Sequence, residues 1–167
     1  MCGAFVYVYV SGVHYQLRGS EVEHGGIGEL IIRRLDLESR FNIRPTQDVI
    51  TIVSEHGRLA AKPMHWGLIS SGSTPEKLTR KTFNVRDDRL AESPMWSGVF
   101  KRGRGVIPAS GFFEWKRTNG SQQPMYFTLK EGEILHFAAV YDSLINERGE
   151  TIDSCAIRSQ RVHVEYS

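Results

Sequence analysis

The first three residues, Met1, Cys2 and Gly3, carry the most distinctive chemistry in this sequence. A small residue at position 2 favours removal of the initiator methionine, which would leave Cys2 with a free α-amine beside its thiol. Because an α-amine titrates at about 8 and a thiol at about 8.5, both are partly nucleophilic at neutral pH. Such a pair condenses with an aldehyde: the amine forms a Schiff base and the thiol closes a thiazolidine on the same carbon. From these three residues alone, a small buried cysteine near the terminus is the simpler interpretation.

Glu114 is the carboxylate whose neighbours best suit it to proton transfer. It lies in the run Phe112-Phe113-Glu114-Trp115, and aromatic surroundings desolvate a carboxyl group, which favours its protonated form near neutral pH. A side chain facing outward from an alternating strand is the alternative. Glu114 is therefore a candidate proton shuttle only in combination with other motifs.

Asn84 and Arg86 are candidates for holding a sugar-phosphate. The amide of Asn84 offers a donor and an acceptor in one plane, although asparagine also commonly marks turns. In an extended segment Arg86 points to the same side as Asn84, and its planar guanidinium suits a phosphate. A surface ion pair of Arg86 with Asp87 or Asp88 is the alternative.

Trp66 and Trp115 each carry an aromatic face on which a nucleic-acid base could stack. A tryptophan beside glycine, as Trp66 is beside Gly67, more often lies in a core. The six histidines, at positions 14, 24, 56, 65, 136 and 163, show none of the spacings of metal ligands. The sequence therefore predicts neither a metal site nor a cofactor.

Length and composition predict a single domain over residues 1–167. Of the 167 residues 40% are hydrophobic, and this length can bury a core without disulfides. The two cysteines, Cys2 and Cys155, form no CxxC or paired pattern. The apolar run from Phe5 to Val10 lacks a basic flank and is far shorter than the roughly 20 residues of a membrane span. We therefore expect a cytoplasmic protein.

The net charge of +2 is too small to indicate nucleic-acid binding by itself. Its distribution is uneven, because eight basic residues between Lys77 and Arg104 stand against three acidic ones. This excess predicts a local basic face, although most charged runs are simply solvated surface.

Strand patterns dominate the chain. Runs rich in β-branched and aromatic residues predict strands at 4–10, 49–53, 59–69, 105–115, 125–129, 134–141 and 151–157. Pro108 and Gly111 indicate a bend in the fourth of these, and Asn119-Gly120 marks a turn. Helices are predicted at 28–37 and 87–92, and loops at 11–26 and 70–75. The predicted fold class is α+β, with a curled, mostly antiparallel, barrel-like sheet and a few short flanking helices.

Five short motifs occur in an order that resembles the SRAP family of abasic-site processing proteins. They are Met1-Cys2-Gly3, Phe41 to Gln47, Trp66 to Ile69, Asn84-Val85-Arg86 and Ile107 to Trp115. Each motif alone is weak, but five in this order, within residues 2–141, are fairly specific.

This resemblance implies an SRAP-like fold and a sensor of abasic sites in single-stranded DNA, active in DNA repair. Cys2, exposed by self-cleavage or by an aminopeptidase, would form a thiazolidine crosslink with the ring-opened sugar. Asn84 and Glu114 match the family's active-site asparagine and glutamate. We assign Arg86, Trp66, Arg44 and Pro45 as DNA contacts.

The chain departs from the family pattern in three ways. The family usually has arginine where this chain has Ala4, and Arg44 is the candidate replacement. Family members also continue for several dozen residues after the last predicted strand and carry an active-site histidine there. His163 follows Cys155 too closely to be its counterpart. We therefore expect a truncated or altered C-terminal part, a missing acid/base group and an exposed sheet edge.

Other functions stay open at this level. A cysteine with a free amine and a glutamate could form an N-terminal-nucleophile peptidase. The basic and aromatic residues could instead form a non-enzymatic single-stranded DNA binding module, and a truncated copy could be an inactive relic. Under the first hypothesis the partner is single-stranded DNA with abasic sites and the protein is a monomer.

Overall fold

The computed structural model describes residues 3–7, 39–56, 58–70, 82–118, 120–130 and 134–159. Its elements are β1 (Ala4–Tyr7), β2 (Arg40–Ile43), β3 (Asp48–Glu55), β4 (Arg58–Trp66), β5 (Asn84–Arg86), α2 (Asp87–Glu92), α3 (Pro94–Arg102), β6 (Arg104–Ala109), β7 (Gly111–Thr118), β8 (Ser121–Phe127), β9 (Leu135–Ile145) and β10 (Thr151–Ser159). Several predictions concern positions outside the described residues: Cys2, the loop at 11–26, the helix at 28–37, most of the loop at 70–75, and His163.

The larger sheet closes into a barrel. Its strand order is β4-β3-β6-β9-β10-β5, and β4 also pairs with β10, so that the five strands from β4 to β10 form a ring. This closure is parallel, with His65 opposite Ser154 and Trp66 opposite Cys155. The ladders β3–β4, β6–β9 and β9–β10 are antiparallel. The predicted α+β fold with a curled, mostly antiparallel, barrel-like sheet is confirmed.

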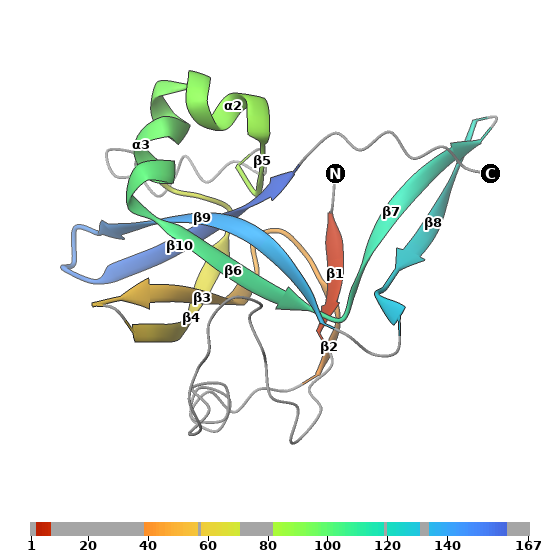
Figure 1. Ribbon diagram of the computed structural model, residues 1–167, viewed down its shortest axis with the longest axis horizontal. Coiled ribbons are helices and arrows are strands. Elements are labelled where there is room, and N and C mark those ends of the chain that lie inside the picture. Colours follow the sequence, from red (N-terminus) through yellow and green to blue (C-terminus); the bar gives the residue numbers. More distant parts are fainter. Residues whose placement is uncertain are drawn as a thin grey trace.

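A second sheet, with the order β2-β1-β7-β8, projects from one end of the barrel (Figure 1). The chain crosses from β6 in the barrel to β7 in this sheet at Ser110, whose N–H donates to the carbonyl of Val6 at 2.8 Å. The bend is possible because position 111 is glycine: a Cβ there would lie 2.5 Å from Cζ of Tyr126 and 2.7 Å from the carbonyl oxygen of Phe127. The predicted bend in 105–115 is therefore confirmed, as a passage between two sheets.

The buried side chains form two hydrophobic clusters. The first fills the barrel and continues under the second sheet, and it includes Phe5, Ile43, Trp66, Ile107 and Cys155. The second lies under α2 and α3, where Leu90 and Val99 pack with residues of β5, β9 and β10. The helices therefore cover one side of the barrel, as Figure 1 shows, and leave the second sheet uncovered by them.

Helix α2 confirms the helix predicted at 87–92, whereas α3 was not predicted. Pro94 begins α3 with the backbone angle that a first helical turn requires. Only Val99 is buried, with Trp96 and Phe100 partly buried beside it, so the apolar stripe is short. Gly98 lowers the intrinsic helix propensity of this segment further. Packing of α3 against the barrel therefore provides the stability that the sequence of the helix alone lacks.

Gly103 follows α3 at a point where the chain passes close to the backbone of β9. A Cβ at this position would overlap the carbonyl oxygen of Tyr141 and lie 3.0 Å from its carbon. Because that backbone is in the sheet and cannot yield easily, Gly103→Ala should lower the free energy of unfolding by at least about 2 kcal/mol in a denaturant titration.

Gly98→Ala is the matched control. Its Cβ would meet only the end of the flexible Arg102 side chain, at 3.1 Å, and alanine improves helix propensity by about 1 kcal/mol. Its stability should stay within about 1 kcal/mol of the wild type. Equal stability of the two variants would contradict the assigned packing.

Candidate functional site

Trp66 is a buried residue that contacts the chain segments carrying the candidate site residues. Its side chain has 0% exposure. The indole lies edge-on to Phe5 of β1 and to Phe83, with ring centroids at 5.1 and 5.8 Å. Its Nε1–H donates to the carbonyl oxygen of Phe83 at 2.8 Å. One side chain therefore joins the end of β4 to β1 and to the residue before Asn84.

The backbone of Trp66 holds the loop from Arg44 to Gln47. Its carbonyl accepts from the N–H of Thr46 at 2.8 Å, and its N–H donates to the carbonyl of Gln47 at 2.9 Å. Thr46 adopts a positive φ of 77°, an uncommon conformation for a β-branched residue, which these bonds maintain. Gln47 Oε1 also accepts from the N–H of Arg44 at 3.0 Å. Arg44 and Pro45 are thus held on a pinned turn.

Glu114 and Trp115 lie beside the N-terminal end of β1. The antiparallel register pairs Ala4 with Phe113 and Phe5 with Phe112, so Gly3 continues at the level of Glu114. Trp115 reaches the same point, because a Cβ on Gly3 would lie 3.9 Å from its Cζ3. Both side chains are half-buried. The structure therefore brings the predicted proton shuttle to the residue that directly follows Cys2.

Arg44 adds a positive charge to this place. Its guanidinium carbon lies 6.0 Å from the centroid of the Trp115 ring, within the range of a cation–π contact. Its Nε donates to Oδ1 of Asn42 at 2.8 Å, and the residue is exposed. The cation is therefore oriented by a neutral partner and an aromatic face, and its charge stays accessible to an anionic ligand.

Asn84 and Arg86 follow shortly after Phe83, whose carbonyl accepts the hydrogen bond from Trp66. Both belong to β5, which pairs in parallel with β10 and places Asn84 opposite Ile157. The extended conformation puts the two half-buried side chains on one face, as predicted, with Val85 buried between them. Arg86 donates from Nε to Oδ1 of Asp88 at 3.0 Å, which is the ion pair that the sequence offered as the alternative.

The prediction for Trp66 needs correction. Trp66 has no exposed surface on which a base could stack, so it is a core residue, and Trp115 is the tryptophan at the site. In the described part of the basic stretch between Lys77 and Arg104, two cations lie close to carboxylates, whereas Arg89, Lys101 and Arg104 are exposed. Arg86 pairs with Asp88, and Arg102 lies 3.4 Å from Oδ2 of Asp142.

Cys155 is a structural residue of the barrel. It is fully buried, and burial raises the pKa of its thiol to about 12, an effect that the neighbouring Thr51 partly opposes. Such a thiol is a poor nucleophile at neutral pH.

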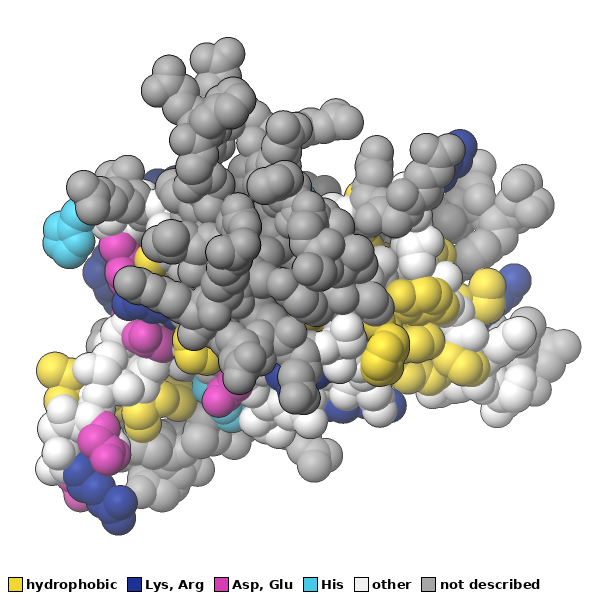
Figure 2. All heavy atoms as spheres, turned by 90° about the horizontal axis from the view of Figure 1, so that it is seen from below, with side chains coloured by type: hydrophobic (Ala, Val, Ile, Leu, Met, Phe, Trp, Pro, Cys, Tyr) yellow, Lys and Arg dark blue, Asp and Glu magenta, His cyan; other side chains and the backbone are white. Residues whose placement is uncertain are grey.

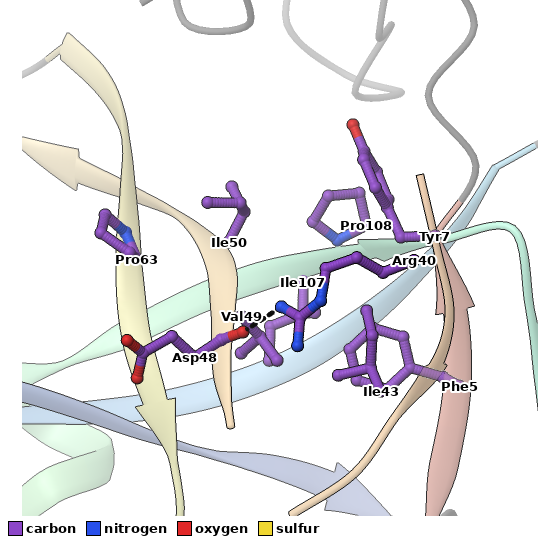
Figure 3. Close-up of a pocket in the computed structure, with 10 residues that line it drawn as sticks. All are labelled: Phe5, Tyr7, Arg40, Ile43, Asp48, Val49, Ile50, Pro63, Ile107 and Pro108. Carbon is purple, nitrogen blue, oxygen red and sulfur yellow. Dashed lines mark hydrogen bonds between the residues drawn. The ribbon is translucent and has the colours of Figure 1, made fainter. Parts of the chain in front are cut away.

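A pocket of about 310 Å³ lies between the second sheet and the barrel. Figure 3 shows Arg40 reaching across it, with Nη1 donating to the carbonyl of Asp48 at 2.6 Å. The other lining side chains are mostly apolar, among them Phe5, Val49 and Ile107. Glu114, Trp115 and Asn84 do not line it, so it is separate from the site at Gly3.

Sequence patterns missed the connections that assemble this site. The carbonyl of Phe83 and the contact of Trp115 with Gly3 join segments distant in the chain, and no local motif marks them. Within the described ranges, no group of three or more His, Cys, Asp or Glu side chains could hold a metal. No helix in the described part of the chain is long and apolar enough to cross a membrane.

Comparison with known proteins identifies a family. The model of the family described as SOS response associated peptidase (SRAP) matches residues 1–163. The chain is 31% identical over 118 residues to abasic site processing protein YobE of Bacillus subtilis, covering 70% of this chain and 54% of that protein. It is 42% identical over 67 residues to abasic site processing protein HMCES of Xenopus tropicalis, covering 38% of this chain and 20% of that protein. The chain spans about half the length of the Bacillus relatives it matches.

Solved structures share the fold. A protein from Bordetella bronchiseptica aligns with a TM-score of 0.70 and 20% identity, over 96% of this chain and 73% of its own. One from Bacteroides thetaiotaomicron aligns with a TM-score of 0.67 and 24% identity, over 78% of this chain and 58% of its own.

The role of Trp66 can be tested with Trp66→Phe. This change removes the Nε1–H donor and leaves the Phe83 carbonyl without that bond, and it also leaves a void in the first cluster. We expect a loss of about 2–4 kcal/mol in the free energy of unfolding by denaturant titration. Trp96→Phe, at a half-buried position in α3, should cost less. Equal losses would contradict the assignment.

The burial of Cys155 predicts its reactivity. In a Cys2→Ala chain, a thiol reagent at neutral pH should label no residue in the folded protein and one in denaturant. Because the folded pKa is raised from 9.0 to about 12, the stabilisation is present below about pH 9 and is lost as the pH rises toward 12. The free energy of unfolding should therefore decrease above about pH 9 in that chain, and less so in a chain that also carries Cys155→Ala. Rapid labelling of the folded protein would show that Cys155 is accessible.

Proposed function

The chain belongs to the SOS response associated peptidase family, and from this membership we propose that it processes abasic sites in single-stranded DNA. The relatives named above are described as abasic site processing proteins. We propose further that Cys2, after removal of Met1, forms a covalent thiazolidine crosslink with the aldehyde of the abasic sugar. Removal of Met1 is itself a peptide hydrolysis, which is the peptidase part of the activity.

The observation that carries this proposal is the position of Glu114 and Trp115 beside Gly3. Gly3 lies level with Glu114 in the β1–β7 ladder, and Cys2 precedes Gly3 directly. A carboxyl group at that level is suited to exchange protons with the amine, the thiol and the sugar oxygen. The site therefore combines a nucleophile pair with a proton shuttle.

The reaction balances without a cofactor. The α-amine of Cys2 adds to the aldehyde carbon to give a carbinolamine, which loses one water to form a Schiff base. The Schiff base keeps its N–H proton, and the thiol then adds to the same carbon with loss of its own proton, which closes the five-membered ring. Glu114 donates a proton to the leaving hydroxyl and takes one from the thiol, so it ends in its initial state.

The proposed contacts with the substrate are Asn84, Arg86, Arg44 and Pro45. The amide of Asn84 would hold the opened sugar. Arg86 would bind a phosphate in place of its present partner, Asp88. This exchange costs little, because an exposed ion pair of this kind stabilises a protein by only about 0–1 kcal/mol. Arg44 would bind a second phosphate beside Trp115.

The finer parts of the function are predictions. We propose that residues 1–167 act as one domain, as a monomer, in the cytoplasm, and with a preference for single strands. Glu114 is the proposed acid/base group.

Intact-mass spectrometry tests the proposal directly. A chain that has lost Met1 is incubated with a single strand that contains one abasic site. The expected product has the combined mass of protein and oligonucleotide less one water. Cys2→Ala should give no adduct, and Glu114→Gln should slow adduct formation by about 10²- to 10⁴-fold, because it keeps the shape but not the proton transfer.

The matched substrate control carries a tetrahydrofuran analogue, which has no aldehyde and should give no adduct. A trimmed wild-type chain that binds the abasic strand but gains no mass would refute the crosslink. Cleavage of added peptides without adduct formation would favour the N-terminal-nucleophile peptidase.

A further inference from the structure

We propose that one face of the β7–β8 hairpin is a stacking surface for single-stranded DNA beyond the abasic residue, with Tyr126 and Phe113 as its platform. The inference deepens the proposed function, on which it rests for the location of the reactive sugar. The surface itself is defined by the sheet and does not depend on Cys2 chemistry.

The register places three pairs in a row on this face. In an antiparallel sheet, the side chains of two directly opposite residues lie on the same face. Because side chains alternate between faces along a strand, every second pair lies on that same face. The pairs are Arg117 with Gln122, Trp115 with Pro124, and Phe113 with Tyr126. Successive pairs are about 7 Å apart along the strands, so the Trp115 pair, which contacts Gly3, lies between the Arg117 pair and the Phe113 pair.

Tyr126 presents an aromatic ring whose orientation is set by the sheet. Its ring and hydroxyl lie over Gly111, where a Cβ would be only 2.5 Å from Cζ, and its centroid lies 4.9 Å from that of Phe113. The residue is nevertheless 47% exposed. A ring that is fixed from below and open above loses little entropy when a base stacks on it.

The surroundings of these rings suit a polyanion. The described residues of β1, β7 and β8 on this face include no carboxylate. Arg117 is exposed at the hairpin end of the row, and Arg44 lies over Trp115 in its middle. Aromatic faces interleaved with arginine are the pattern by which proteins hold single strands without sequence preference.

The structure supports addition of another strand at the edge of this sheet less well than it supports base stacking. β8 is an edge strand in the described sheet, but Pro124 lies in it and lacks the N–H that an added strand would need. Three of the large exposed hydrophobic side chains, Phe41, Tyr126 and Leu129, lie in or next to this sheet. Figure 2 shows hydrophobic side chains grouped at that end of the molecule.

Fluorescence anisotropy with a labelled single strand tests the surface. The strand carries a tetrahydrofuran analogue in place of the abasic sugar, so binding is reversible and needs no aldehyde. Tyr126→Ala should raise the Kd by about 5- to 150-fold, the range for removal of one base–aromatic stack. Tyr126→Phe should bind like the wild type because it keeps the aromatic face.

Two further variants separate stacking from folding. Tyr126→Leu keeps apolar contact with Phe113 but has no aromatic face, so it should fold and still bind weakly. Gln123→Ala changes an exposed residue of the same strand on the opposite face and should leave the Kd unchanged. A 2-aminopurine placed next to the analogue should be quenched by the wild type and by Tyr126→Phe, but less by Tyr126→Leu.

The outcomes distinguish this surface from the crosslinking function. Crosslinking with a Kd indifferent to Tyr126 would overturn the surface and leave the function intact. Binding that depends on Tyr126 without any crosslink would support the surface and refute the function. If Tyr126→Leu changes the oligomeric state while DNA affinity stays constant, the face packs against protein and the proposal is wrong.

Discussion

The burial of one indole, with its N–H bonded to the carbonyl of Phe83, is the constraint on which the candidate site depends. Trp66 has no exposed surface, and a buried indole donor without a partner would cost about 1–3 kcal/mol. Satisfying it ties the approach to β5 to the end of β4. The same residue packs on Phe5 and pins the turn at Thr46, so three separate segments share one anchor.

This arrangement divides the site between a rigid interior and an open surface. The anchor and the barrel core exclude water, whereas Glu114 and Trp115 are half-buried and Arg44 is exposed. The candidate side chains therefore extend from backbone whose position is set by the core. Pre-organisation of this kind lowers the entropy that binding must overcome.

The positive charge available at the candidate site depends less on the net charge of the chain than on which arginines have carboxylate partners. Arg86 and Arg102 have carboxylate partners, whereas Arg89, Lys101 and Arg104 of the same stretch are exposed. Arg44 differs, because its partners are the amide oxygen of Asn42 and the ring of Trp115. A phosphate beside Trp115 would meet a cation that needs no exchange of partners, whereas one at Arg86 would replace Asp88.

Local sequence determined much of the fold: alternation and β-branched runs predicted most strands, glycine and proline predicted the bend near Ser110, and motif order predicted the family. It also named Glu114 and Arg44 as candidate residues. Only the tertiary structure decided that Trp66 is core, that Trp115 lies against Gly3, and that α3 forms. The physical reason is that propensity and periodicity act over a few residues. Burial, register and ion pairing join positions far apart in the chain, and they are set by how whole strands pack.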